Sequence, residues 1–114
     1  MNETAPPGSP APPAPDITIR ELQRLIRDRY YATDSARGAA GTFMWFIEEV
    51  GELATALHDN APDRSPTPAQ RANLLEEFAD VLAWLTTLAN ITGVDLADAL
   101  TKYSDPDRVK GTKH

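Results

Sequence analysis

The stretch FMWFIEEVGELATAL (residues 43–57) combines a helical apolar pattern with three carboxylates, Glu48, Glu49 and Glu52. At about 100° per residue, the apolar side chains form one broad arc of a helix. Glu49 and Glu52 lie together at the edge of that arc, on a stripe that they share with Trp45, whereas Glu48 lies further round, toward solvent. Paired negative charges beside a buried face repel each other unless a cation lies between them. The stretch therefore predicts a helix with a cation-binding edge.

A second copy of this pattern follows further along the chain. EEVGELATAL (48–57) aligns without a gap with EEFADVLAWL (76–85). In the second copy, Glu77 and Asp80 lie at the edge of the apolar arc, and Trp84 lies on their stripe. A short loop between two helices makes them antiparallel neighbours. We therefore expect the two acidic pairs to converge on one spot.

Four converging carboxylates are the oxygen-donor set that Mg²⁺, Mn²⁺ or Ca²⁺ prefers. The plainer interpretation is that each acidic pair belongs to a solvated helix face. A di-iron carboxylate site needs Glu-x-x-His on two helices, which this chain cannot supply, because His58 lies on the far side of its helix and His114 is the last residue. The predicted metal ligands are Glu49, Glu52, Glu77 and Asp80.

The composition suits one soluble domain. The chain has 114 residues, no cysteine and 41% apolar residues, so we expect an ordinary core and no disulfide. The sequence contains no apolar run of about 20 residues that would span a membrane and no signal-peptide pattern, so we expect a cytoplasmic protein without a membrane partner. The net charge of −6 disfavours nucleic acid as a partner and allows a small anionic substrate bound through a divalent cation.

Helix signals divide the chain into segments. Thr18 with Glu21 and Thr67 with Gln70 form capping-box patterns that begin helices, and Gly93 is a C-terminal stop. We expect loops at ATDSARGAAG (32–41) and DNAPDRSPTP (59–68), which separate helices that end near Tyr31, His58, Ile91 and Lys102, the last one capped by Asp95. The expected domains are a disordered Pro/Ala-rich tail (1–16), a helical domain (17–104) and a C-terminal extension (105–114).

The expected fold class is all-α, a four-helix bundle in which two long antiparallel helices carry the acidic motifs. No segment shows the alternation of a strand. Much of the apolar arc on the two long helices stays exposed in so thin a unit, and exposed apolar surface of this kind marks an interface. We therefore expect a homo-oligomer, either a homodimer or a homotetramer.

The two acidic motifs resemble those of a known family. E-E-x-x-E on one helix followed by E-x-x-D on the next is similar to the MazG-like nucleotide pyrophosphohydrolases of the all-α nucleoside triphosphate pyrophosphatase superfamily. WFIEEVGELATAL and EEFADVLAWLTTLANITGVDLADAL carry the resemblance, which covers about residues 20–103. It implies a MazG-like helical domain that pairs into dimers or tetramers. The implied activity is Mg²⁺-dependent hydrolysis of a nucleoside triphosphate to the monophosphate and pyrophosphate, as a house-cleaning or pool-regulating enzyme.

The resemblance also implies residue roles at the metal site and beside it. The four predicted ligands would hold the metal, and Glu48, beside Glu49, would help to hold a second cation or orient the attacking water and accept its proton. Trp84 would contact the nucleotide, and Trp45 is a second candidate for stacking on base or sugar. Alternatively, both tryptophans are core or interface residues.

The phosphate contacts are the part of the site where this chain departs from the family. Lys102 stands where the family carries a lysine, but the asparagine that commonly follows is missing, and Arg108 and Lys110 are offset. Arg37, in the expected first loop, is another candidate for binding substrate phosphate. Each of these residues can equally be an ordinary solvated charge.

Two other functions are compatible with the same residues. One is a non-catalytic helical partner module that has retained the metal site for stability. The other is a phosphoribosyl-ATP pyrophosphatase, which performs the same chemistry on a different substrate. The complete acidic set favours an enzyme, because a module without catalysis has no need of all five acids.

Overall fold

In the computed structural model, which describes residues 16–108, the first helix begins where the sequence predicts. Helix α1 spans Ile19–Asp59. The hydroxyl of its N-cap, Thr18, accepts a hydrogen bond from the Glu21 amide at 3.0 Å, and the Glu21 carboxylate accepts one from the Thr18 amide at 2.8 Å. This capping box satisfies amides that the first helical turn leaves unpaired. The bond from the Thr18 amide also lowers the pKa of Glu21.

The second long helix, α2, spans Pro68–Thr92 and also has the expected ends. Thr67 caps it, accepting a bond from the Gln70 amide at 3.1 Å and donating its own amide to the Gln70 side chain at 2.9 Å. Gly93 ends the helix with φ 73°, in the left-handed region. Glycine adopts this conformation without the steric cost that a Cβ imposes.

The expected loop over residues 32–41 is wrong, because α1 continues through it. Only Gly38 leaves the helical conformation, with φ 81° and ψ 170°, and there the helix kinks. The segment is rich in alanine, the best helix former, and Asp34 pairs with Arg37 one turn on, with an N–O distance of 3.3 Å. These local preferences keep the chain helical up to the glycine. We call residues 19–37 the first half of α1 and residues 39–59 the second half.

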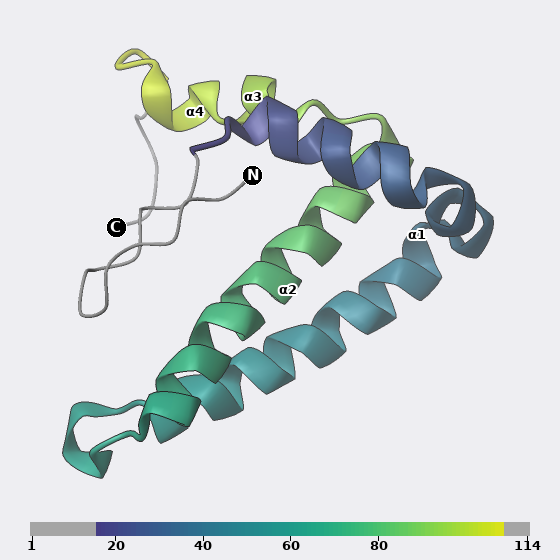
Figure 1. Cartoon of the computed structure of the whole chain (residues 1–114). Coiled ribbons are helices and arrows are strands. Elements are labelled where there is room, and N and C mark those ends of the chain that lie inside the picture. The colour runs from purple at the N-terminus through teal and green to yellow at the C-terminus, as the bar shows by residue number, and fades with distance from the viewer. Residues whose placement is uncertain (1–15, 109–114) are drawn as a thin grey trace, which may run out of the picture.

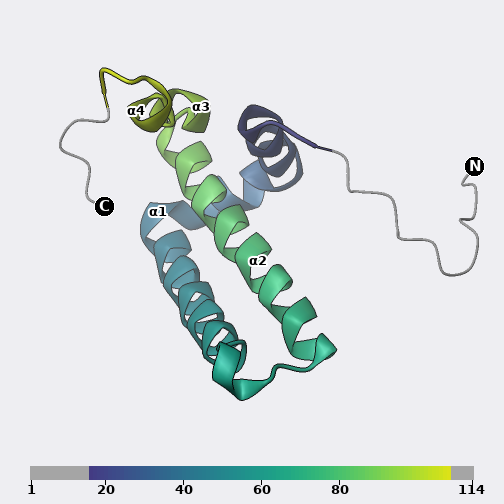
Figure 2. The same ribbon diagram turned by 90° about the vertical axis from the view of Figure 1, so that its left-hand side faces the viewer.

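The second half of α1 and α2 run antiparallel and side by side (Figures 1 and 2). The short connection between them contains a 3-10 turn, η1, at Pro62–Arg64. The first half of α1 turns away at the kink and crosses the other end of α2, where it meets α3 (Figure 1). The hairpin of α1 and α2 confirms the antiparallel pair that the short loop predicts.

The C-terminal part of the described chain differs from the expected single helix. Asp95 caps α3 (Leu96–Ala99) as predicted, accepting a bond from the Ala97 amide at 2.9 Å. A turn at Leu100 then separates α3 from a second one-turn helix, α4 (Thr101–Ser104). The count of four helices is therefore not confirmed in the expected form, although every element of the described residues is helical.

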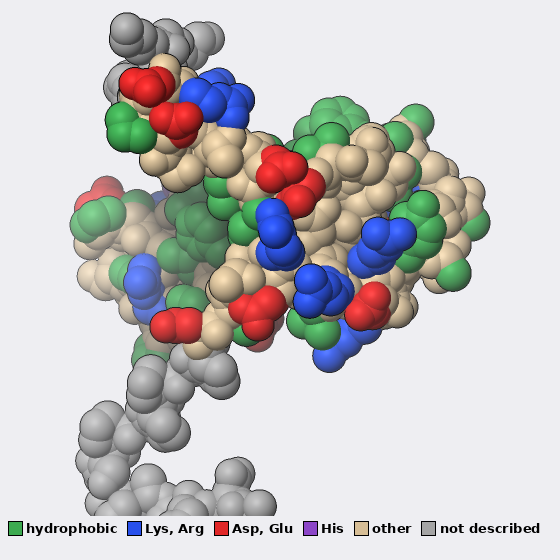
Figure 3. Space-filling view, turned by 90° about the horizontal axis from the view of Figure 1, so that it is seen from above, with side chains coloured by type: hydrophobic (Ala, Val, Ile, Leu, Met, Phe, Trp, Pro, Cys, Tyr) green, Lys and Arg blue, Asp and Glu red, His purple; other side chains and the backbone are tan. Residues whose placement is uncertain are grey.

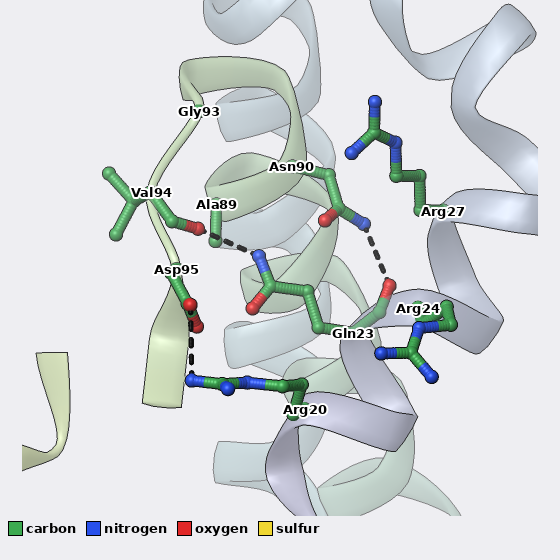
Figure 4. A pocket seen from close by; sticks show the side chains of 9 residues that line it. All are labelled: Arg20, Gln23, Arg24, Arg27, Ala89, Asn90, Gly93, Val94 and Asp95. Atoms are coloured by element: carbon green, nitrogen blue, oxygen red, sulfur yellow. Dashed lines mark hydrogen bonds and ion pairs between the residues drawn. The ribbon is translucent and has the colours of Figure 1, made fainter. Parts of the chain in front are cut away.

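The side chain of Gln23 forms hydrogen bonds that connect the first half of α1 to the turn between α2 and α3 (Figure 4). Its side-chain nitrogen donates to the carbonyl of Val94 at 2.7 Å, and its side-chain oxygen accepts from the Leu96 amide at 2.9 Å. Asn90 of α2 donates to the backbone carbonyl of Gln23 at 3.3 Å, and Arg20 pairs with Asp95 at 3.2 Å. These contacts fix the direction in which the chain leaves the kink.

The buried seam of the molecule consists mainly of small and polar side chains, with Ile26 and Leu74 as its large apolar members. Thr42, Ala56, Glu77, Thr86 and Thr87 are all buried. Many large apolar side chains of both long helices are exposed instead, up to 74% for Met44 and 67% for Leu75. The others that are at least about half exposed on these helices are Tyr30, Phe43, Trp45, Ile47, Leu57 and Phe78.

The view from above shows apolar side chains open to solvent among intermingled acidic and basic ones (Figure 3). None of the described helices is both long and apolar enough to cross a membrane. The expected tail and most of the C-terminal extension, residues 1–15 and 109–114, lie outside the described residues.

Candidate metal centre and adjoining pocket

The structure brings together three of the four predicted metal ligands. Glu49 and Glu52 come from the second half of α1, and Glu77 comes from α2. Each offers a carboxylate oxygen, and these oxygens all lie within 4.8 Å of one another. We call these three residues the acidic cluster. Asp80, one turn after Glu77, is exposed and does not belong to the cluster, but its charge acts on it.

The acidic cluster is electrostatically unfavourable in the absence of a cation. Burial raises the pKa of Glu49 to about 7, assisted by its hydrogen bond with Glu52 and by the charges of Glu52, Asp80 and Glu77. Glu77 is only 8% exposed, and burial, followed by the charge of Glu52, raises its pKa as well. Burial and neighbouring negative charge therefore disfavour the ionised form of both carboxyls, and a positive charge between them would favour it.

The donor set of the cluster fits a hard divalent cation. One oxygen of Glu49, Oε2, is buried and has no hydrogen-bond partner among the described residues. Unpaired buried oxygens are costly, and a metal ion supplies the missing partner. Oxygen-only coordination suits Mg²⁺ or Mn²⁺. Glu49, Glu52 and Glu77 can therefore hold such an ion, with Asp80 near enough to contribute charge.

Glu48 lies outside the acidic cluster. Its side chain is exposed, as the helical wheel predicts, although it precedes Glu49 directly in sequence. Lys102 belongs to α4, and its ammonium stands 5.6 Å from the ring centroid of Tyr103 in the same short helix. Arg108 bonds to the hydroxyl of Thr101. Lys110 lies outside the described residues.

The two tryptophans of the acidic stripes contact each other across the helix pair. The rings of Trp45 and Trp84 are stacked, with centroids 6.2 Å apart and planes inclined by 16°. The guanidinium of Arg37 stands 5.0 Å from the ring centroid of Trp84. Arg37 also donates to the Thr42 hydroxyl at 3.0 Å and to Asp34 at 3.3 Å. Arg37 therefore bridges the kink and reaches α2, rather than extending into solvent.

A cavity of about 360 Å³ lies between the first half of α1 and α2, bordered by Trp84. This volume is near the lower end of ligand pockets, roughly 300–1,000 Å³. Its walls are apolar, aromatic or hydroxyl-bearing except for Asp34 and Arg37. We call this cavity the Trp84 pocket, and its other lining residues are Ile26, Tyr30, Thr33, Ala83 and Thr87.

Sequence reasoning missed Asp34, the one carboxylate in the wall of this pocket. It belongs to the segment that reads as a loop, where an aspartate is ordinarily a turn residue. The only signal was its spacing of three from Arg37, which pairs the two side chains once the segment is helical.

Comparisons with known proteins point to one family. Residues 38–105 match the family described as the MazG nucleotide pyrophosphohydrolase domain. The chain is 30% identical over 108 residues to mouse (Mus musculus) dCTP pyrophosphatase 1, covering 89% of this chain and 63% of the relative. It is 38% identical over 73 residues to the bovine (Bos taurus) dCTP pyrophosphatase 1, covering 60% and 43%. It is 34% identical over 83 residues to the dATP/dGTP diphosphohydrolase of Cyanophage S-2L, covering 73% and 67%. The chain thus spans less than two thirds of the length of the two dCTP pyrophosphatases.

Proposed function

Because the chain belongs to the MazG nucleotide pyrophosphohydrolase family, we propose that it hydrolyses a nucleoside triphosphate to the monophosphate and pyrophosphate. The observation that carries this proposal is the convergence of carboxylate oxygens of Glu49, Glu52 and Glu77 within 4.8 Å of one another. The Trp84 pocket, which α2 also lines, is large enough for a nucleobase. The names of the relatives, which act on dCTP or on dATP and dGTP, support a deoxynucleoside triphosphate as substrate.

The proposed metal ligands are the three residues of the acidic cluster together with Asp80. A bound Mg²⁺ or Mn²⁺ supplies charge neutralisation between the carboxylates and the triphosphate, and it lowers the pKa of bound water. The role of the three cluster residues together with Asp80 is to hold four acidic groups in a fixed arrangement on two helices. Ionisation of Glu49 at neutral pH belongs to this role, because its pKa of about 7 in the metal-free protein falls when a cation is bound.

Glu48 is the proposed proton acceptor, or the ligand of a second cation. It is exposed and adjoins the cluster in sequence, so it can reach water at the edge of the site rather than at its buried centre. A Glu48→Gln variant keeps the size of the side chain and removes its basicity. We expect it to lose turnover under saturating Mg²⁺, and full turnover in this variant would refute the role.

The Trp84 pocket is the proposed site of the nucleoside, with Trp84 as its aromatic wall. Trp45 stacks on Trp84 and therefore sets the position of that wall. Arg37 contacts both the pocket and the kink, so we propose that it shapes the nucleoside site as well as offering a positive charge. Lys102 remains a proposed phosphate contact. Nucleotide-dependent fluorescence quenching in the single variants Trp84→Phe and Trp45→Phe tests the two tryptophans separately.

A substrate panel tests the reaction. Purified protein is incubated with Mg²⁺ and each ordinary and deoxy triphosphate, and the products are resolved by chromatography. We expect monophosphate and pyrophosphate from the wild type, loss of both in Glu49→Ala, and retention in Asp63→Ala, which removes an exposed carboxylate in the η1 turn. Absence of turnover on every triphosphate, with or without Mn²⁺, would overturn the proposal and favour a non-catalytic module.

We also propose that the unit is a homodimer or a homotetramer. The exposed apolar side chains of both long helices, such as Met44 and Leu75, form more open apolar surface than a stable monomer ordinarily shows. A second copy of the chain would cover it. Light scattering at micromolar concentration gives the mass, and a monomeric mass would count against this assembly.

A further inference from the structure

Asp34 is a buried carboxylate in which one oxygen accepts a hydrogen bond and the other has no partner among the described residues. Its side chain is 5% exposed. Oδ1 accepts a hydrogen bond from Arg37 at 3.3 Å, whereas Oδ2 is buried and has no donor among the described residues. Buried polar atoms in proteins nearly always have a partner. Oδ2 of Asp34 is therefore an acceptor whose donor the described residues do not supply.

The position of Asp34 identifies the kind of donor. Asp34 lines the Trp84 pocket, whose other walls, Arg37 apart, are apolar, aromatic or hydroxyl-bearing. Pockets of this composition bind flat apolar groups and orient them through a few polar contacts. A carboxylate oxygen only accepts hydrogen bonds, so the group that it meets must carry an N–H or O–H.

We propose that Asp34 selects nucleobases that carry an exocyclic amino group, by accepting a hydrogen bond from that group at Oδ2. This inference rests on the proposed function, because it assumes that the Trp84 pocket receives the base of the substrate. It assigns a specificity role to a residue outside the acidic motifs.

The base edges differ in a way that a carboxylate can detect. Cytosine and adenine each present an amino donor beside a ring-nitrogen acceptor, and guanine presents an amino donor as well. Uracil and thymine present a carbonyl oxygen where cytosine has its amino group, and this oxygen would face Oδ2 of Asp34 with like partial charge. The guanidinium of Arg37, with five N–H donors, has donors beyond those used by Thr42 and Asp34 for the adjacent acceptor of the base. The pair Asp34 and Arg37 therefore matches a donor–acceptor edge.

Two substrate pairs isolate the amino group. dCTP and dUTP differ by an amino group against a carbonyl on a pyrimidine, and dATP and dITP differ in the same way on a purine. We expect wild-type kcat/KM to favour the amino member of whichever pair fits the pocket by roughly 10- to 100-fold, the range for leaving a buried charged acceptor unpaired. Equal kcat/KM within both pairs would overturn the proposal without affecting the proposed reaction.

The variant Asp34→Asn tests the residue itself. The amide has the same shape but also donates, so we expect the preference within each pair to fall to near unity or to reverse. Asp28→Asn is the matched control, because it removes an exposed carboxylate from the same half of α1. A retained preference in Asp34→Asn would refute the assignment. So would a change in the mass by light scattering with an unchanged base preference, because Oδ2 would then serve an interface between subunits.

Nucleoside binding separates this inference from the hydrolytic activity. Deoxycytidine, deoxyuridine, deoxyadenosine and deoxyinosine lack phosphates and need no metal, and their binding can be followed by tryptophan fluorescence and by calorimetry. Binding of an amino nucleoside that weakens in Asp34→Asn would support the inference even if no triphosphate is hydrolysed. Hydrolysis without any base preference would instead support the proposed function alone.

Discussion

Replacing Gly38 by alanine tests whether the kink in α1 is imposed by its backbone. Gly38 has φ 81° and ψ 170°, a region that residues with a Cβ essentially never occupy, at a cost of about 1–3 kcal/mol. A Cβ built at this position meets no atom within 4 Å, so the expected loss comes from backbone strain and not from a clash. We therefore expect Gly38→Ala to lower the free energy of unfolding by about 1–3 kcal/mol.

Gly51 supplies the matched control within the same helix. It has helical geometry, and a Cβ there also meets nothing within 4 Å, so Gly51→Ala should stabilise the protein by up to about 1 kcal/mol. The two variants make the same chemical change with opposite expected signs. Urea unfolding and melting temperature measure the difference, at roughly 4–8 °C per kcal/mol for a domain of this size and at equal protein concentration, since assembly shifts stability. If Gly38→Ala were as stable as Gly51→Ala, the reasoning that a Cβ strains the backbone of residue 38 at the kink would be refuted.

The remaining predictions concern the acidic cluster and the hydrogen bonds of Gln23 to the turn between α2 and α3. In the metal-free protein the pKa of Glu49 is raised from 4.5 to about 7, so its contribution to stability is complete below about pH 4.5 and is lost as the pH rises through 7. In the presence of a chelator, the melting temperature should fall between pH 5 and pH 8. Addition of Mg²⁺ should restore it far more at pH 8 than at pH 5. A flat pH profile that Mg²⁺ does not change would contradict the burial of Glu49. Gln23→Ala removes the side-chain hydrogen bonds to Val94 and Leu96. We expect it to lower the free energy of unfolding by about 1–3 kcal/mol, at about 0.5–1.5 kcal/mol per bond, and to speed hydrogen exchange at the Leu96 amide. Unchanged exchange there would show that Gln23 is not needed to hold the turn between α2 and α3.

Local signals in the sequence were sufficient for the ends of the helices at Thr18, Thr67 and Gly93 and for the convergence of three of the four predicted acidic residues. The capping boxes at Thr18 and Thr67 and the stop at Gly93 form as predicted, because each depends on residues within one turn. The facing of Glu49 and Glu52 toward Glu77 follows from helical periodicity and a short connection. The helix caps and the helical periodicity both depend on short spacings along the chain, which tertiary packing changes little.

The kink and the Trp84 pocket depend on weaker signals. The residues 32–41 contain two glycines, an aspartate and a serine, which together resemble a loop, yet only Gly38 breaks the helix because alanines surround it. The pocket forms from residues on two helices whose relative direction the kink determines. Asp34 becomes visible as a site residue only when that direction is known. The roles of Glu48 and Lys102 stay predictions, because Glu48 is exposed beside the cluster and the only contact of Lys102 described above is with its neighbour Tyr103.

The stacked pair of Trp45 and Trp84 is an intrinsic spectroscopic probe of the spacing between the second half of α1 and α2. The two indoles come from opposite helices, with centroids 6.2 Å apart, and each lies about one helical turn from an acidic residue of its own helix. Electronic coupling between stacked chromophores depends steeply on their separation and tilt. Any event that draws the two helices together or spreads them therefore changes the circular dichroism of the indole bands. The chain carries no other tryptophan, so a change in helix spacing on addition of Mg²⁺ would be detectable in the unlabelled protein.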